Sequence, residues 1–221
     1  MAEIISVDAK SPGFAPINRA AELLRQGQVV AIPTDTFYGL AANPFDPAAV
    51  GKIFEIKGRP KSNPLLLLVN SLEMAARLSA NLPPHFCKLV HRFWPGPLTI
   101  VVEAAPNLPT EVTARTGRIG LRLPAARIPL ELIGAAGFPI TATSANLTGE
   151  QDSSTAQQVQ ISLGDRLSLI LDGGISRADK PSTVLDLNGE IWRIVREGAI
   201  SRDEIIKFFD STRGAWEIDP A

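Results

Sequence analysis

The chain has 221 residues, of which 45% are hydrophobic and 20% charged, and its 22 Lys and Arg against 23 Asp and Glu give a formal net charge of −1. This composition supports a sizeable core, excludes a largely disordered chain, and argues against a protein whose main role is to coat nucleic acid. Cys87 is the single cysteine, so the chain can form neither an internal disulfide nor a four-cysteine metal cluster.

Short β-branched runs alternate with amphipathic stretches along the chain, which predicts a mixed α/β fold with several parallel strand pairs. In chain order, the expected elements are helix 17–26, strand 29–32, a helix from 46 toward 58, strand 65–69, helix 71–78, helix 84–93, strands 98–103 and 119–123, helix 128–136, strand 139–143, helix 155–161, strands 167–171 and 183–187, and helix 201–209. N-caps are expected at Asp46, Ser71 and Ser201. We expect one domain over 1–209 and a short polar tail over 210–221.

No stretch is suited to a membrane span or an export signal. The longest aliphatic run, residues 65–69, is far shorter than the roughly 18 apolar residues that a spanning helix needs. The first residues lack a basic segment followed by a long apolar one. We therefore expect no membrane partner and a cytoplasmic location.

The signatures of common nucleotide-binding sites and of other enzyme classes are missing. There is no Walker A loop, no dinucleotide-binding glycine pattern and no kinase set. A serine hydrolase is disfavoured because Ser144 lies outside a G-x-S-x-G word. Cys87 and His91 could share a helical face, but two ligands do not make a zinc site.

Four polar clusters follow expected strands or helices, where open α/β folds often bind ligands. They are residues 33–40, 57–64, 139–149, and a composite of 172–174, 182–184 and 196–198. Each could be an ordinary turn whose side chains satisfy the backbone. As a binding element, Lys57 and Arg59 could converge on phosphate oxygens from a solvent-facing turn. The small hydroxyl and amide groups of 139–149 suit close approach to an anion or nucleotide.

Eight short words occur along the chain in a familiar order. They are PTDTFYGL at 33–40, KGRP at 57–60 with NPL at 63–65, WPGPLT at 94–99, LRLP at 121–124, SANLTG at 144–149, LDGG at 171–174, STVLD at 182–186 and REGAI at 196–200. Over about residues 16–202, this order resembles the YrdC-like family, the threonylcarbamoyl-AMP synthases. The resemblance implies the YrdC-like α/β fold, an open twisted mixed parallel/antiparallel sheet flanked by helices, in the short single-domain form of the family.

The resemblance also implies an activity and its partners. The activity is that of a nucleotidyltransferase that condenses L-threonine, bicarbonate or CO2, and ATP into threonylcarbamoyl-AMP and pyrophosphate, for the threonylcarbamoyl modification of adenosine 37 in tRNA. The implied partners are these substrates and downstream threonylcarbamoyl-transfer proteins, with tRNA or double-stranded RNA as a further candidate. Mg2+ is expected with ATP, without an assigned protein ligand.

Site residues follow from the matching words. By resemblance, the threonine contacts are Thr36, Arg122, Ala142 and Ser182, with Arg122 pairing with the carboxylate. The ATP contacts are Lys57, Arg59, Asn63, Ser144, Asn146, Asp152 and Arg196. Lys57 and Arg59 are also the implied catalytic residues, because the chemistry needs positioning and charge neutralisation rather than a covalent nucleophile.

The chain departs from the family pattern at two places. Leu68 stands where many relatives carry a histidine, so a polar threonine contact there is absent or replaced by backbone. Asp152 begins a D-S-S-T word where Ser-Pro-Thr is usual, and this change affects one nucleotide contact.

An RNA-binding module of the same fold is the alternative. Its basic surface would use Lys52, Lys57, Arg59, Lys61, Arg115, Arg118, Arg122 and Arg127. The neutral hydroxyl and amide content of loops 34–36, 144–146 and 182–183 favours the synthase, because RNA binding relies on cations and aromatic rings. A third possibility is a regulatory module with a degenerate site. In such a module Thr36, Lys57, Arg59 and Arg196 would be free to vary, yet all four are present.

Overall fold

The computed structural model describes residues 1–58, 60, 64–176, 178–188 and 191–212. The elements in chain order are β1 (Glu3–Ser6), α1 (Phe14–Arg25), β2 (Val30–Ile32), β3 (Gly39–Ala41), α2 (Pro47–Lys57), β4 (Leu66–Leu68), α3 (Leu72–Arg77), α4 (Phe86–Phe93), β5 (Leu98–Glu103), β6 (Arg118–Arg122), α5 (Arg127–Ala136), β7 (Ile140–Thr141), β8 (Thr143–Ser144), α6 (Ala156–Leu163), the 3-10 helix η1 (Gly164–Arg166), β9 (Leu169–Asp172), β10 (Thr183–Asn188), β11 (Ile191–Arg196) and α7 (Arg202–Thr212). Within these residues, no helix has both the length and the apolar character that a membrane span requires.

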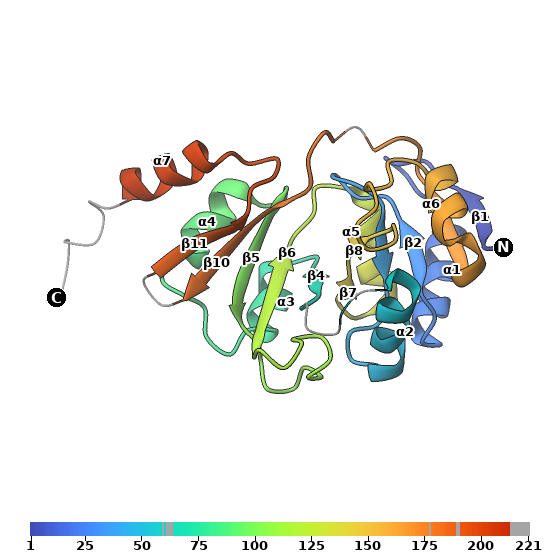
Figure 1. Ribbon diagram of the computed structural model, residues 1–221, viewed down its shortest axis with the longest axis horizontal. Coiled ribbons are helices and arrows are strands. Elements are labelled where there is room, and N and C mark those ends of the chain that lie inside the picture. The colour runs from blue at the N-terminus through green and yellow to red at the C-terminus, as the bar shows by residue number, and fades with distance from the viewer. Residues whose placement is uncertain (59, 61–63, 177, 189–190, 213–221) are drawn as a thin grey trace.

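The strands form two mixed sheets, one toward each end of the molecule (Figure 1). The first sheet has the order β1-β9-β2-β3-β8 and the second has the order β11-β10-β5-β6-β4-β7. The parallel pairs are β1 with β9, β2 with β9, β5 with β10 and β4 with β6, and the other pairs are antiparallel. The predicted mixed parallel/antiparallel α/β fold is confirmed, and the structure adds that its strands are divided between two sheets.

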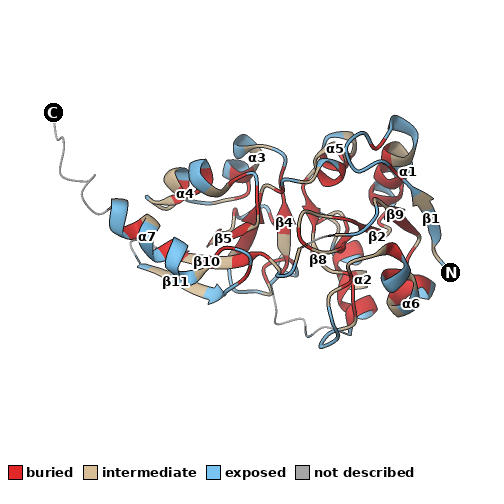
Figure 2. Ribbon diagram, turned by 90° about the horizontal axis from the view of Figure 1, so that it is seen from above, coloured by how far each residue is buried: buried red, intermediate tan, exposed pale blue. Residues whose placement is uncertain are grey.

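Helices cover both faces of the first sheet, because alternate residues along a strand point to opposite sides. On β2, Val30 and Ile32 belong to an apolar cluster with residues of α1 and α5. The residue between them, Ala31, belongs to the other cluster, which includes residues of α2 and α6. Figure 2 shows the same arrangement, with α1 and α5 on one side of these strands and α2 and α6 on the other. A strand buried on both faces explains the continuous apolar run at 29–32.

The second sheet is apolar on one face and lines a cavity with the other. On β5, Leu98, Ile100 and Val102 join the main core, which also contains residues of α4 and α7. Thr99 and Val101 alternate with them and line the cavity. The strands β6 and β10 follow the same rule, so their polar residues are gathered on the cavity face.

Most of the expected elements are confirmed. The three expected N-caps accept backbone hydrogen bonds from the first turns of α2, α3 and α7, and Gly58 ends α2 in the left-handed conformation. The helix α7 continues to Thr212, so three residues of the expected tail are helical. The rest of that tail, residues 213–221, lies outside the described part of the chain.

Three strands were not predicted, and one was predicted as a single piece but is divided. β1 and β3 are only four and three residues long, and β3 lies inside the polar cluster at 33–40. β11 is longer, but its apolar residues in I-W-R-I-V-R do not alternate with polar ones as a strand period requires. The expected strand at 139–143 divides into β7, which pairs with β4 in the second sheet, and β8, which pairs with β3 in the first. This segment therefore passes from one sheet to the other at Ala142.

The start of α6 provides a stability test. Thr155 caps this helix in a capping box with Gln158. We expect Thr155→Ala to lower the free energy of unfolding by about 1 kcal/mol, because a backbone N–H loses its acceptor. Denaturant unfolding measures the change. The control is Gln157→Ala, an exposed position in the same first turn, which should stay within about 0.5 kcal/mol of the unchanged protein. Equal stability of Thr155→Ala and the control would contradict the capping role.

Candidate functional site

A cavity of about 560 Å³ lies between the two sheets. Strands of both sheets contribute to its wall, and the loops around residues 36, 152 and 182 complete it. The predicted site residues that line it are Thr36, Arg122, Ala142, Ser144, Asp152, Ser182 and Arg196. These residues are up to 160 positions apart in the sequence, from Thr36 to Arg196, and the fold brings them together around one space. Two other predicted residues, Arg59 and Asn63, lie outside the described residues.

Arg122 is a buried cation held by three segments of the chain. It ends β6 on the cavity face and is only 3% exposed. Its Nε donates to the carbonyl of Gly96 at 3.0 Å, and Nη1 donates to Thr36 Oγ1 at 3.1 Å. Nη2 lies 2.6 Å from Asp35 Oδ1 in an ion pair. The words at 33–40, 94–99 and 121–124 therefore meet at one guanidinium.

Arg196 is the second cation of the cavity and is fixed to Ser182. Its Nη2 donates to the Ser182 carbonyl at 2.9 Å and to Ser182 Oγ at 3.1 Å. Ser182 Oγ in turn lies 2.9 Å from Thr99 Oγ1. Burial lowers the pKa of Arg196, the nearby Asp152 charge opposes this effect, and the like charge of Arg122 adds to it. The two guanidinium groups therefore share one electrostatic environment, which suits anionic ligands.

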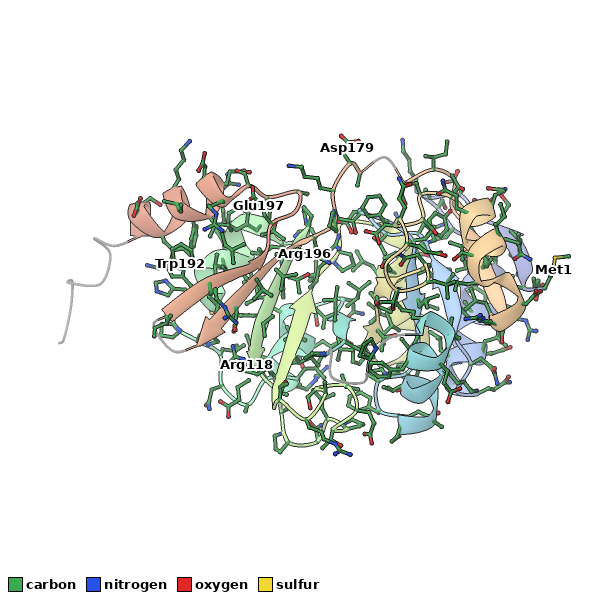
Figure 3. All side chains as sticks on the ribbon, in the orientation of Figure 1. Met1, Arg118, Asp179, Trp192, Arg196 and Glu197 are labelled. Atoms are coloured by element: carbon green, nitrogen blue, oxygen red, sulfur yellow. The ribbon has the colours of Figure 1, made fainter. Side chains whose placement is uncertain are left out.

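Figure 3 helps to place this second cation. Arg196 lies near the middle of the molecule, between the two groups of strands, whereas Trp192 of the same strand lies toward the outer end of the second sheet. Because β11 runs from one to the other, its later residues, Arg193, Val195 and Arg196, line the cavity, while its first residues lie toward the outer end of that sheet.

Lys57 does not lie in the solvent-facing turn that the sequence suggested. It is the last residue of α2 and is 3% exposed. Its Nζ donates to the carbonyls of Ser144 and Asn146, at 2.5 and 2.8 Å, and to Asn146 Oδ1 at 3.0 Å. Burial of an ammonium group requires such acceptors, which is why the side chain turns into the fold rather than toward water. Lys57 therefore holds the loop that carries Ser144.

The loop after β8 is held by its own polar groups as well. Ser144 Oγ donates to Asn146 Oδ1 at 2.6 Å, and Asn146 Nδ2 donates to the Glu150 carbonyl at 2.6 Å. Asn146 is 4% exposed and does not line the cavity, whereas Ser144 does. Ser144, a predicted ATP contact, therefore has direct access to the cavity. Asn146 has no such access; it accepts hydrogen bonds from Ser144 and Lys57 and so holds Ser144 in place.

Tyr38 is part of the cavity wall and ties three of the polar words together. Its side chain is fully buried, and its hydroxyl donates to the Gly174 carbonyl at 2.7 Å and lies 3.3 Å from Asp172 Oδ1. Its backbone carbonyl accepts from Ala145 N at 2.8 Å. Burial and then the Asp172 charge raise the pKa of Tyr38 above its usual value of 10.

The two departures from the family pattern have different outcomes. Leu68 is completely buried in the apolar cluster with α1 and α5 and does not line the cavity, so its side chain has no polar role there. Asp152 does line the cavity and interacts electrostatically with Arg196. Among the described residues, no group of three His, Cys, Asp or Glu side chains is arranged to hold a metal ion.

Sequence reasoning missed several groups of this wall and also Asp35, which lies behind it. Asp35 and Tyr38 lie inside a recognised word but were given no role, and Thr99 lies inside an expected strand. Arg118, Asp186 and Arg193 form a further cluster on the same wall, in which Asp186 pairs with both arginines. A signal for Arg118 and Asp186 was available in the sequence. Along β6 the other residues alternate with the apolar Ile119 and Leu121, and along β10 they alternate with Leu185 and Leu187, so they must lie on the face away from the core.

Comparison with known proteins gives a consistent result. Residues 22–198 match the family model Sua5_yciO_yrdC, described as telomere recombination. The chain is 39% identical to threonylcarbamoyl-AMP synthases of Pyrococcus abyssi, over 89% of its length, and of Bacillus subtilis, over 90%. It spans 58% of the length of each of these two relatives. The crystal structure of Pyrococcus abyssi Sua5 complexed with L-threonine superimposes with a TM-score of 0.90 and 36% identity, over 99% of this chain and 65% of that one.

The raised pKa of Tyr38 can be measured directly, because the chain has a single tyrosine. We expect the tyrosinate absorbance of the folded protein to appear at a pH above 10 and to return to about pH 10 in denaturant. The neutral hydroxyl is the form that folding favours, so its contribution to stability is complete below about pH 10 and is lost as the pH rises further. Tyr38→Phe should lower the free energy of unfolding at pH 8 by about 1–2 kcal/mol. A folded-state midpoint at or below pH 10 would contradict this environment.

Proposed function

The chain belongs to the Sua5/YciO/YrdC family, and we propose that it condenses L-threonine, bicarbonate or CO2, and ATP into threonylcarbamoyl-AMP and pyrophosphate. The observation that carries the proposal is the convergence of two arginines, Arg122 and Arg196, with hydroxyl groups on one cavity. Such a site suits two anionic reactants that must be held side by side. The names of the relatives and the threonine complex of the Pyrococcus abyssi protein support the same reading.

Threonine would occupy the part of the cavity next to Arg122. The guanidinium and the Thr36 hydroxyl to which it donates offer adjacent polar groups for the substrate carboxylate. Ala142, at the crossing between β7 and β8, and Ser182 also line the cavity and would contribute a small side chain and a hydroxyl. These four residues are the threonine contacts that the resemblance implies.

ATP would occupy the part next to Arg196 and Ser144. Arg196 would neutralise phosphate charge, and the loop held by Lys57 would present Ser144. Arg59 and Asn63 stay predicted ATP contacts. Mg2+, expected with the nucleotide, would neutralise further phosphate charge, and Asp152 is a carboxylate of the cavity wall that could ligate it.

The chemistry proceeds in two steps without a covalent enzyme intermediate. The neutral threonine amine attacks the carbon of CO2 and releases one N–H proton to solvent. With bicarbonate, the hydroxyl leaves together with that proton as water, and both routes form the same carbamate. A carbamate oxygen then attacks the α-phosphorus of ATP, and the bond to pyrophosphate breaks. The protein contributes by holding the carbamate near the α-phosphate and by stabilising the charge that develops on the leaving pyrophosphate. We propose that the product passes to threonylcarbamoyl-transfer proteins that modify tRNA adenosine 37. The cytoplasmic location stays a prediction.

The RNA-binding alternative is not favoured. Several cations of its expected basic surface are engaged within the fold. Lys52 donates to the Gly27 carbonyl, Arg127 pairs with Glu131, and Arg118 pairs with Asp186. Lys57 and Arg122 are buried. The carboxylate partners of Arg118 and Arg127, and the burial of Lys57 and Arg122, reduce the positive charge that the surface offers to a phosphate backbone.

Pyrophosphate release from ATP by the purified protein tests the proposed function. We expect release that requires both L-threonine and bicarbonate, because the nucleophile forms only from these two. Release without threonine would indicate a simple ATP hydrolase, and folded protein that binds ATP without any release would contradict the synthase.

The two arginines should affect the two substrates differently. We expect Arg122→Gln to raise the KM for threonine by about tenfold or more, and the KM for ATP by less than about threefold. Arg196→Gln should show the reverse. Steady-state pyrophosphate release at varied concentrations of each substrate measures both values. If either variant changes the two KM values by the same factor, the division of the cavity is wrong.

A further inference from the structure

We propose that Asp35 is a positioning residue for threonine binding, which holds the Arg122 guanidinium in the cavity wall from the side opposite to the substrate. The inference rests on the proposed function, because it concerns the same cavity. Asp35 lies in the first polar word, between two threonines that line the cavity, and neither the sequence nor the resemblance gave it a role.

The placement of Asp35 excludes direct contact with a ligand in the cavity. Its side chain is absent from the cavity wall and lines a smaller hollow behind it, with Pro33, Ile128 and Gly173. Both of its carboxylate oxygens and Arg122 Nη2 are completely buried. The ion pair of 2.6 Å between them is therefore sealed from the cavity. Nη1 and the Thr36 hydroxyl are then the groups that a substrate carboxylate would meet.

Arg122 needs such a partner for its charge. Its other two contacts, the Gly96 carbonyl and the Thr36 hydroxyl, are neutral. A guanidinium that is 3% exposed without a counter-ion would be an uncompensated buried charge, which is strongly destabilising. Arg196 adds repulsion, since the two cations interact across the same cavity. Asp35 balances this charge, so that Arg122 can stay in the wall when no substrate is bound.

The geometry of Asp35 also fixes the direction in which Arg122 faces. Its neighbour Thr36 accepts from Nη1, while Asp35 faces Nη2, so adjacent residues of one turn hold both terminal nitrogens. Thr34 steadies this turn, because its Oγ1 accepts from Thr36 N at 3.0 Å and donates to the Phe37 carbonyl at 2.7 Å. A planar guanidinium held at three nitrogens cannot rotate, and a fixed fork binds a carboxylate with less loss of entropy.

The test compares Asp35→Asn with Asp35→Glu. We expect Asp35→Asn to raise the KM for threonine by about tenfold, with the KM for ATP changed by less than about twofold. Asp35→Glu keeps the charge and should recover most of the threonine affinity. The matched control is Glu131→Gln, which removes one carboxylate charge from the exposed Arg127 pair on α5 and should leave both KM values unchanged.

A double variant separates positioning from any other role. In the Arg122→Gln background, Asp35→Asn should cause no further rise in the KM for threonine, because the residue through which it acts is gone. It should also raise the resistance to denaturant relative to Arg122→Gln alone, since it removes a carboxylate left buried without its partner. This second readout does not depend on activity and remains available if Asp35→Asn alone folds poorly.

Three results would overturn the inference. They are an equal rise in both KM values, a lower KM for threonine in Asp35→Asn, and a rise of the same size in the Arg122→Gln background. Failure of the proposed function is distinguishable, because it appears in the unchanged protein as the absence of threonine-dependent pyrophosphate release. An active protein whose threonine KM is insensitive to Asp35→Asn would contradict the positioning role alone.

Discussion

The burial of one positive charge is the constraint on which the site depends. Arg122 ends β6 and is only 3% exposed, so its guanidinium must find acceptors within the protein. Those acceptors come from the turn after β2 and from the segment between α4 and β5. The segment before β5 belongs to the second sheet, like Arg122 itself, whereas the turn after β2 belongs to the first. The full set of acceptors is therefore present only when the two sheets are assembled, and the same contacts close the wall of the cavity.

The alternation of side chains along the second sheet explains why there is a cavity at all. One face of β5, β6 and β10 is aliphatic and packs into the main core, and the other carries threonine, arginine, aspartate and glycine together with Val101 and Val184. Gly120 is part of this second face, and a methyl group there would lie 3.0 Å from the Thr99 side chain. A sheet with one polar face cannot be covered by an apolar helix, so a space lined by polar groups remains between the sheets.

Many residues of the recognised words hold loops rather than face the cavity. Lys57 and Asn146 are buried, do not line the cavity and bond to a neighbouring loop. Tyr38 lines the cavity, but its hydroxyl bonds to the loop after β9. Thr183 Oγ1 accepts from the backbone of Gly198 and Ile200, and a side chain at Gly198 would collide with the Pro181 carbonyl. Few side chains could serve at these positions, because each must meet a fixed set of backbone partners. A recognised word in the sequence therefore indicates a loop of fixed conformation. Only some of its residues face the cavity, and the others hold the loop through hydrogen bonds.

The sequence by itself determined the α/β class, the positions of most helices and strands, the helix caps and the set of polar words, because these follow from local periodicity and short-range hydrogen bonds. It also identified seven residues that line the cavity. Only the tertiary structure decided that the strands form two sheets, that 139–143 crosses between them, that Lys57 turns inward and that Asp35 pairs with Arg122. These outcomes depend on which distant groups meet a buried charge, and such contacts join residues as far apart as 35 and 122, beyond the reach of any local pattern.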